Sequence, residues 1–302
     1  MSSIGTRYPQ EKPENPYVLV NYLGFMYKNF ASRFCPGCGY GIIGHLLTRV
    51  FEDEKLNPLL FPFIIGIGCY TQLPEILHYE SQKVVTLHGR APAIVTGMKL
   101  ANPKLKPIIL SGDGDALGIG GNHFLHLCRR NLDCIIFIFN NAIYGMTGGQ
   151  VAPTTPAGAY STTTPYEVIQ RPLDACKVAL AAGATYVART TVAHPRTFQK
   201  YFLRALHHKG TSVIEVITPC VTYFGRFNLN DEGKKMDTGG KLIEWIKDHC
   251  IRLNQLGDLS ENQILNKYVI GEFRFTEEIP EYATEYQKVI AQAQKAGGVP
   301  LE

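Results

Sequence analysis

Two polar side chains follow two apolar runs of the sequence, and together they can bind a metal ion. The first run ends in Ser-Gly-Asp-Gly-Asp, which contains Asp113, and the second ends in Asn-Asn, which places Asn141 28 positions later. A carboxylate oxygen, an amide oxygen and a backbone carbonyl just after Asn141 suit Mg²⁺, which usually also bridges to phosphates. Gly112 and Gly114 would let the backbone approach a phosphate closely. The pattern favours a magnesium–diphosphate site, and the alternative is a tight turn without ligand.

Four cysteines could form a second site. Cys35 and Cys38 flank a Pro-Gly turn, whereas Cys69 and Cys220 each follow an apolar run. Four thiolates at one edge of a sheet can hold a [4Fe–4S] cluster or a structural Zn²⁺. Structural zinc usually takes two close cysteine pairs, and only one close pair is present, so the cluster is favoured. The alternative is that Cys69 and Cys220 are ordinary buried cysteines.

The other four cysteines lie inside helix or strand patterns, and we expect them in the core: Cys128, Cys134, Cys176 and Cys250.

The elements that would position both sites alternate along the chain. Residues 107–110 and 134–139 read as buried strands with a helix between them, which is a βαβ unit. Ligands of such sheets bind beyond the carboxyl ends of the strands. Further strands are expected at 59–67, 84–87, 186–189 and 212–217, and helices at 41–51, 91–101, 170–182, 195–208, 241–254 and 280–295. The fold class is therefore α/β, a doubly wound, mostly parallel sheet with helices on both faces.

Three regions differ in character. Residues 1–34 read as an arm, in which 18–27 is a short strand or helix, and residues 35–227 form the main domain. Residues 228–302 are more charged and read as an extension that wraps or covers the core. Residues 150–165, rich in Thr, Pro, Gly and Ala, read as a long functional loop.

Composition limits the classes of function. The chain has 302 residues, 45% of them hydrophobic and 19% charged, with a net charge of +4. No long basic run suggests nucleic-acid binding, and no apolar stretch suggests a membrane span. The polar N-terminus does not resemble a secretory signal, so we expect a cytoplasmic protein. In a reducing compartment, spaced cysteines bind metals more often than they form disulfides.

Six blocks of sequence together resemble the β subunits of the 2-oxoacid:ferredoxin oxidoreductases, most closely the 2-oxoglutarate type. They occur in order over most of residues 30–227: CPGCG at Cys35, GIGC at Gly66, HGRA at His88, GDGDALGIGGNH at Gly112, FNNAIYGMTGGQ at Phe139 and TPC at Thr218. The Gly-Asp-Gly and Asn-Asn blocks are similar to the thiamine diphosphate motif, so the resemblance implies a thiamine-diphosphate-binding fold.

The resemblance also assigns residues. It implies that Cys35, Cys38, Cys69 and Cys220 hold one [4Fe–4S] cluster, and that Asp113, Asn141 and the carbonyl of Ile143 bind Mg²⁺. Thiamine diphosphate would contact Ile67, Gly68, Cys69, Tyr70, His88, Gly114, Asp115, Gly145 and Met146. His88 is the candidate catalytic residue. The family often has Ser where this chain has Tyr70, which leaves the role of a hydroxyl there open.

The activity implied is the coenzyme A-dependent oxidative decarboxylation of 2-oxoglutarate to succinyl-CoA and CO₂, or its reverse, with electrons passing through the cluster to ferredoxin. The family places the pyrimidine-binding domain and its glutamate on a larger α subunit, and two such pairs form a dimer of heterodimers. Pyruvate or other 2-oxoacids are alternative substrates, and Arg90 is a candidate partner for the distal carboxylate of 2-oxoglutarate. A non-catalytic iron–sulfur electron carrier is the alternative from another class.

Overall fold

The computed structural model describes residues 34–77, 81–231, 234–235, 238–264 and 267–297. The arm at 1–33, with the expected element at 18–27, lies outside these residues, so its structure stays a prediction.

An eight-stranded sheet forms the centre of the molecule, in the order β11-β12-β7-β8-β4-β3-β1-β2. Six strands run parallel: β1 (Phe63–Ile65), β2 (Lys83–Val85), β3 (Ile108–Gly112), β4 (Cys134–Asn140), β7 (Tyr186–Thr191) and β8 (Thr211–Ile217). Every residue of β3, β4, β7 and β8 is buried, which explains why β3 and β4 read largely as apolar runs. The predicted α/β fold with a mostly parallel sheet is confirmed.

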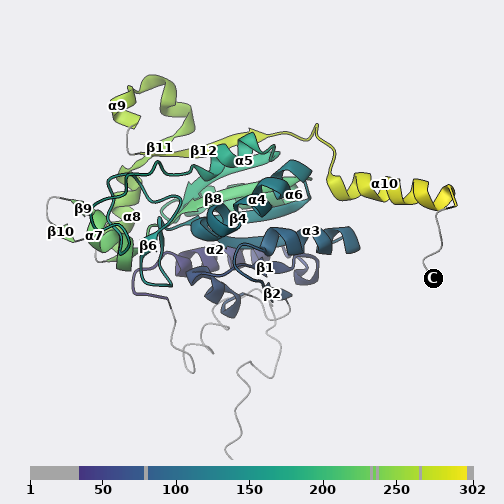
Figure 1. Cartoon of the computed structure of the whole chain (residues 1–302), viewed down its shortest axis with the longest axis horizontal. Coiled ribbons are helices and arrows are strands. Elements are labelled where there is room, and N and C mark those ends of the chain that lie inside the picture. The colour runs from purple at the N-terminus through teal and green to yellow at the C-terminus, as the bar shows by residue number, and fades with distance from the viewer. Residues whose placement is uncertain (1–33, 78–80, 232–233, 236–237, 265–266, 298–302) are drawn as a thin grey trace, which may run out of the picture.

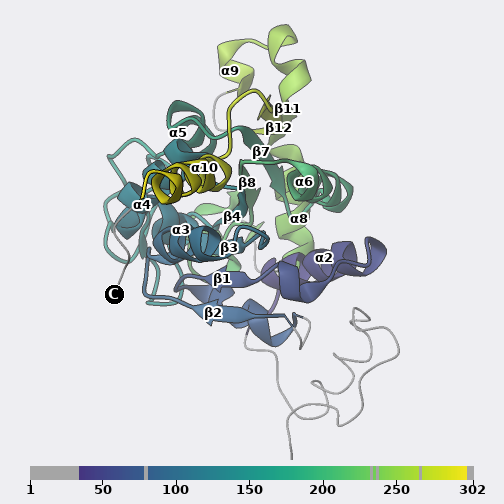
Figure 2. The ribbon, with the colours of Figure 1, turned by 90° about the vertical axis from the view of Figure 1, so that its right-hand side faces the viewer.

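Helices cover both faces of this sheet (Figures 1 and 2). One face carries α2 (Tyr40–Asp53), α6 (Pro195–His207) and α8 (Gly239–Asp248), which pack in one apolar cluster with the strands. The other carries α3 (Ala91–Ala101), α4 (Gly121–Arg130) and α5 (Ala175–Ala181), which pack in a second cluster. The two clusters hold the sheet between them and fix the ends of its strands.

Short elements connect this framework. They are the helical turns η1 (Pro58–Leu60), η2 (Cys69–Glu75), η3 (Gly114–Ile119), η4 (Val221–Gly225), η5 (Leu253–Asp258), α7 (Arg226–Asn228) and α9 (Glu261–Ile264), and the strands β5 (Ile143–Tyr144), β6 (Gln150–Val151), β9 (Asn230–Asp231) and β10 (Lys234–Lys235).

Three predicted boundaries were wrong. The run 59–67 forms the turn η1 before a three-residue strand, because Pro58 begins a helical turn capped by Asn57. The helix expected at 170–182 begins only at Ala175, because the side chain of Asp174 accepts a hydrogen bond from Lys177 N–H and caps it. The helix expected at 241–254 ends at Asp248, and a strand follows it.

The C-terminal region extends the sheet. Strand β12 (Tyr268–Phe275) pairs antiparallel with β7, and β11 (Cys250–Arg252) pairs parallel with β12. Helix α10 (Tyr282–Lys295) then contacts α3 and extends beyond it (Figure 1). The division of the chain at residue 228 stays a prediction, but the residues after it complete the same sheet as those before it.

At the amino ends of the strands, His208 is buried in a hydrogen-bond network. Its Nε2 lies 2.7 Å from Thr185 Oγ1, which donates to Asn131 Oδ1. Burial, together with the charge of Lys106, lowers the pKa of His208 from 6.5 to about 4. Between these two values the unfolded chain binds a proton that the folded chain does not, so stability falls as the pH falls from 6.5 to 4.

We therefore expect His208→Gln to make the pH dependence of stability shallower on the acid side. The wild type should lose roughly 3 kcal/mol of unfolding free energy over this window through His208 alone. Urea unfolding of both proteins at several pH values measures the difference between the two curves. Parallel curves would contradict the assignment.

None of the helices in the described ranges is long and apolar enough to cross a membrane.

Candidate functional site

A pocket opens at the carboxyl ends of β1, β3 and β4. Its volume is about 460 Å³ including the open mouth, a size typical of small-molecule sites. All the residues expected to contact Mg²⁺ or thiamine diphosphate line it: Ile67, Gly68, Cys69, Tyr70, His88, Asp113, Gly114, Asp115, Asn141, Ile143, Gly145 and Met146. Parallel strands bring these distant segments to one edge of the sheet. The structure thus assembles the predicted set, while the ligand that each residue binds stays a prediction.

Asp113 is the buried charge of this pocket. Its side chain is 2% exposed, and the Thr154 hydroxyl donates a hydrogen bond to its carboxylate. Burial raises the pKa of Asp113 to about 7 in the absence of a cation. No described residue brings a cationic side chain to Asp113, so its carboxylate is costly to ionise, and a bound divalent cation would offset this cost. The residue therefore fits the proposed role of Mg²⁺ ligand.

Asn141 lies opposite Asp113 in a tight turn after β4. Its Oδ1 accepts a hydrogen bond from Ile143 N–H at 3.2 Å and retains a second lone pair for another partner. Ala142, between Asn141 and Ile143, has φ of +63°, a left-handed conformation that few residues other than glycine adopt. This conformation lets the turn present two oxygens, the side-chain amide oxygen of Asn141 and the backbone carbonyl oxygen of Ile143.

Asp115 lies next to a histidine at the pocket wall. Its Oδ1 accepts a hydrogen bond from Gly89 N–H at 2.7 Å, and its Oδ2 accepts one from Ser111 Oγ at 2.5 Å. His88 Nε2 lies 3.4 Å from Asp115 Oδ1, and its side chain is 35% exposed toward the pocket. Asp115 is thus a buried carboxylate beside His88, held in place by Gly89 N–H and Ser111 Oγ, and the structure shows no hydrogen bond from it to the His88 ring.

The hydroxyl of Tyr70 faces the back of the pocket. A Cβ on Gly66 would lie 2.6 Å from this hydroxyl and 2.0 Å from Asp115 Oδ2, so only glycine fits below them. The side chain is 2% exposed, and burial together with Asp115 raises its pKa well above the usual value. Tyr70 therefore presents its ring, rather than its hydroxyl, to the pocket.

Four thiols gather next to this pocket. Burial raises the pKa of Cys38 to about 12 and that of Cys69 to about 11, and the neighbouring thiols, Cys35 and Cys220 among them, add to both shifts. Gly145 lies between the pocket and two of these thiols, since a Cβ there would be 3.4 Å from Cys69 Sγ and 3.6 Å from Cys220 Sγ. The predicted convergence of the four cysteines is therefore found in the structure.

No three of these four thiols lie as close together as the ligands of a single zinc ion do. Thiolates on one tetrahedral Zn²⁺ lie ~3.8 Å apart, because Zn–S bonds are about 2.3 Å long. Among the described residues, three ligand atoms within 4.8 Å of one another occur at Asp174, Cys176 and Glu215 and not at these four cysteines. Four iron atoms, each bonded to one thiolate, need the wider arrangement.

Two pocket residues escaped the sequence analysis. The Tyr144 ring covers Gly114, where a Cβ would lie 2.2 Å from it, and its hydroxyl donates to Gly114 O at 3.1 Å. Tyr40, at the start of α2, also lines the pocket. Tyr144 lies inside the block that begins at Phe139, where it was not assigned a role, and Tyr40 lies in an ordinary helix pattern. By contrast, Arg90 donates to the carbonyls of His88 and Ile119 and does not line the pocket.

Comparisons with known proteins decide the family. Residues 66–216 match the family model of the thiamine pyrophosphate enzyme, C-terminal TPP binding domain. The chain is 44% identical over 257 residues to 2-oxoglutarate synthase subunit KorB of Methanocaldococcus jannaschii, which covers 85% of this chain and 92% of that protein. The chain belongs to the KorB family of 2-oxoglutarate synthase subunits.

Other relatives agree. KorB of Methanothermobacter thermautotrophicus is 38% identical over 87% of this chain and 88% of its own length. Among solved structures, the 2-oxoglutarate:ferredoxin oxidoreductase from Magnetococcus marinus, with 2-oxoglutarate, coenzyme A and succinyl-CoA bound, superposes with a TM-score of 0.74 at 28% identity. That match covers 91% of this chain and 90% of the other. The resemblance to the 2-oxoacid:ferredoxin oxidoreductases is confirmed, and a non-catalytic iron–sulfur carrier is set aside because the chain has the fold of a thiamine pyrophosphate enzyme.

Proposed function

We propose that this chain is the β subunit of a cytoplasmic 2-oxoglutarate:ferredoxin oxidoreductase that forms succinyl-CoA and CO₂ from 2-oxoglutarate and coenzyme A, or catalyses the reverse reaction. The observation that carries the proposal is the pocket that unites both halves of the thiamine motif, Asp113 and Asn141, beside four converging cysteines. The Magnetococcus marinus enzyme, which has 2-oxoglutarate and coenzyme A bound, supports the choice of substrates.

The residues that line the pocket would have separate roles in binding and catalysis. Asp113, Asn141 and the carbonyl of Ile143 would hold Mg²⁺, and Gly114 would admit a diphosphate close to the backbone. When bound there, thiamine diphosphate supplies the electron sink for decarboxylation. His88, whose Nε2 lies 3.4 Å from Asp115 Oδ1, is placed at the pocket wall, where its ring could exchange a proton with a bound group. Apolar contacts from Ile67 and Met146 would help exclude water.

A backbone hydrogen bond connects the metal turn, which we define as residues 141–143, to the cysteines. Cys220 N–H donates to Asn141 O at 3.1 Å, so the turn and one proposed cluster ligand form one rigid unit. Cys35 is exposed, whereas the other three proposed ligands are partly buried. We propose that Cys35, Cys38, Cys69 and Cys220 hold a [4Fe–4S] cluster that accepts electrons on the pocket side and passes them to ferredoxin at the exposed side.

The direct test is to purify the native complex anaerobically and assay it with coenzyme A and ferredoxin. We expect 2-oxoglutarate to support ferredoxin reduction much faster than pyruvate. A preference for pyruvate would favour the broader 2-oxoacid alternative, and no 2-oxoacid-dependent reduction would contradict the proposal.

We propose that a larger α subunit completes the site and that two such pairs assemble. The loop after β6 exposes large side chains, with Tyr166 and Ile169 each 93% exposed. Exposed apolar side chains of this size are typical of a surface that a partner covers.

The isolated chain is therefore expected to bind thiamine diphosphate poorly and to turn over no 2-oxoglutarate. Residues 1–302 are expressed alone, the cluster is reconstituted anaerobically, and reduction of a viologen dye is measured. Adding the larger subunit should restore activity. Full turnover by the isolated chain would contradict the shared site.

A further inference from the structure

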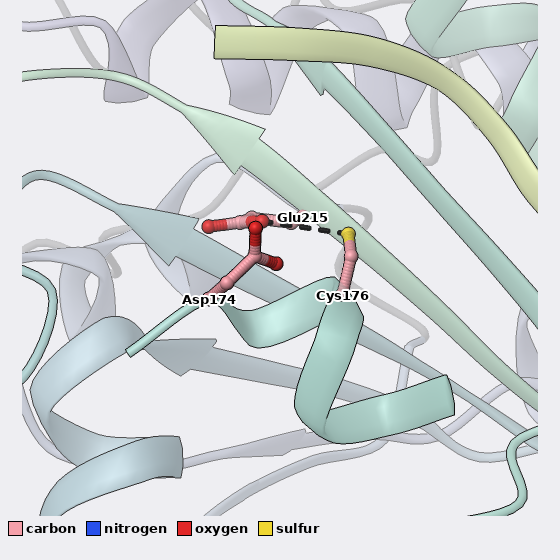
Figure 3. A group of neighbouring side chains, drawn as sticks. All are labelled: Asp174, Cys176 and Glu215. Atoms are coloured by element: carbon pink, nitrogen blue, oxygen red, sulfur yellow. Dashed lines mark hydrogen bonds between the residues drawn. The ribbon is translucent and has the colours of Figure 1, made fainter. Parts of the chain in front are cut away.

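A second cluster of polar side chains lies where α5 begins and on β8, and two of its three members are buried (Figure 3). Asp174, Cys176 and Glu215 each place a ligand atom within 4.8 Å of the others, an arrangement that could suit a metal ion. However, Arg189 already pairs with both carboxylates: Nε donates to Glu215 Oε2 at 2.6 Å, and Nη2 donates to Asp174 Oδ1 at 2.5 Å. Because the guanidinium already binds one oxygen of each carboxylate, we do not assign a metal ion to this cluster.

Glu215 reaches from this ion pair to the strand that carries the metal turn. It lies on β8, is 1% exposed, and its Oε1 accepts a hydrogen bond from Asn140 Nδ2 at 2.8 Å. The other end of the same amide, Asn140 Oδ1, accepts from Ala142 N–H at 3.1 Å. Asn140 thus bridges a buried carboxylate and the residue that has the left-handed backbone.

The charge of Glu215 decides which way this amide faces. An ionised carboxylate only accepts hydrogen bonds, so the NH₂ group of Asn140 must face it. The amide oxygen then faces Ala142 N–H. The reversed amide would oppose two acceptors and leave this N–H without its partner, which is costly in a buried turn. Arg189 Nε donates to Glu215 Oε2 at 2.6 Å, and this ion pair offsets the cost of burying the carboxylate.

We propose that Glu215 is a positioning residue for the metal turn. It acts through Asn140 to fix the backbone of Ala142 and hence the positions of Asn141 and Ile143 on either side. The inference rests on the proposed function, in which these two residues are ligands. It also gives the C-terminal region a role. Arg189 Nη1 donates to Val269 O on β12 at 3.2 Å. Strand β12 therefore helps to position the guanidinium that forms the ion pair with Glu215.

The test uses the complex with its larger subunit and compares Glu215→Gln, Asn140→Ala and the double variant. Mg²⁺ affinity is measured by titration calorimetry at saturating thiamine diphosphate, alongside the melting temperature and the iron content. Each single variant should weaken Mg²⁺ binding about 10-fold, as is usual for residues that support metal ligands. The double variant should bind Mg²⁺ as tightly as the single variant that has the lower Mg²⁺ affinity, because both changes break the same chain of contacts. Iron content should not change.

Cys176→Ala is the matched control. Its thiol also donates to Glu215, but to Oε2, the oxygen that Arg189 already binds. Mg²⁺ affinity should therefore stay at the wild-type value.

Three outcomes separate the possibilities. If either single variant binds Mg²⁺ within about twofold of wild type, or the two effects add, the positioning role is wrong. If Glu215→Gln fails to assemble, Asn140→Ala, which leaves the ion pair intact, must still weaken Mg²⁺ binding in an assembled complex of unchanged iron content, and unchanged affinity overturns the inference. If the wild-type complex retains thiamine diphosphate without Mg²⁺, the proposed metal site itself fails, and the inference fails with it.

Discussion

Asp113→Asn is expected to abolish Mg²⁺-dependent retention of thiamine diphosphate and with it all turnover of 2-oxoglutarate. Asp113 is the one carboxylate in the proposed metal ligand set, and asparagine keeps its shape while removing its charge. Mg²⁺ affinity should fall by more than about 100-fold, since this change affects a proposed ligand directly. Thiamine diphosphate and Mg²⁺ are quantified in the complex after gel filtration.

The same variant should not unfold the protein. Because burial raises the pKa of Asp113 to about 7 in the metal-free chain, its ionised form destabilises the fold above that pH. Metal-free Asp113→Asn should therefore melt at or above the wild-type temperature at pH 8. Asp53→Asn, which changes an exposed carboxylate on α2, should retain the cofactor. Stoichiometric thiamine diphosphate and Mg²⁺ in the Asp113 variant would show that the metal assignment is wrong.

Cys220→Ser is expected to remove the iron–sulfur absorption and the reduction of ferredoxin. The anaerobic wild-type chain should contain about four irons, and this variant far fewer, because a serine oxygen replaces one of four thiolates. Iron analysis and visible absorption are measured on the two complexes side by side.

Cys128→Ser is the matched control for this change. Cys128 is fully buried on α4, in the apolar cluster on the other face of the sheet, so its replacement should lower stability and leave the iron unchanged. Zinc without iron in anaerobically prepared wild type would contradict the cluster, as would full iron content in Cys220→Ser.

The site was predictable from sequence because its residues lie at strand ends. In a parallel sheet, the ends of β3 and β4 meet at one edge whatever the loops do, so Asp113 and Asn141 had to converge. Contacts made by loops carried no such constraint. The hydrogen bond from Thr154 to Asp113 joins residues 41 positions apart, and no periodic pattern specifies it.

The C-terminal strands were missed for a different reason. β11 has three residues and pairs only with β12, so its stability comes from a neighbour and not from its own pattern. Gly271, inside β12, also weakens the strand signal. The ion pair behind the site did leave a trace in the sequence: Arg189 and Glu215 are single charges inside two apolar strands, and the sheet register sets them directly opposite each other. Opposite charges in neighbouring buried strands predict such a pair.

The antiparallel pairing of β12 with β7 has a consequence for the order of synthesis. A chain leaving the ribosome completes β7 and β8 well before it releases β12. During that interval β7 is an open edge strand, and the guanidinium of Arg189 lacks its acceptor on Val269. Domains fold as units once their last strand is available. We therefore expect a chain truncated before residue 268 to keep the edge of β7 unpaired, so that chaperones bind it. Its metal turn should not reach the native conformation.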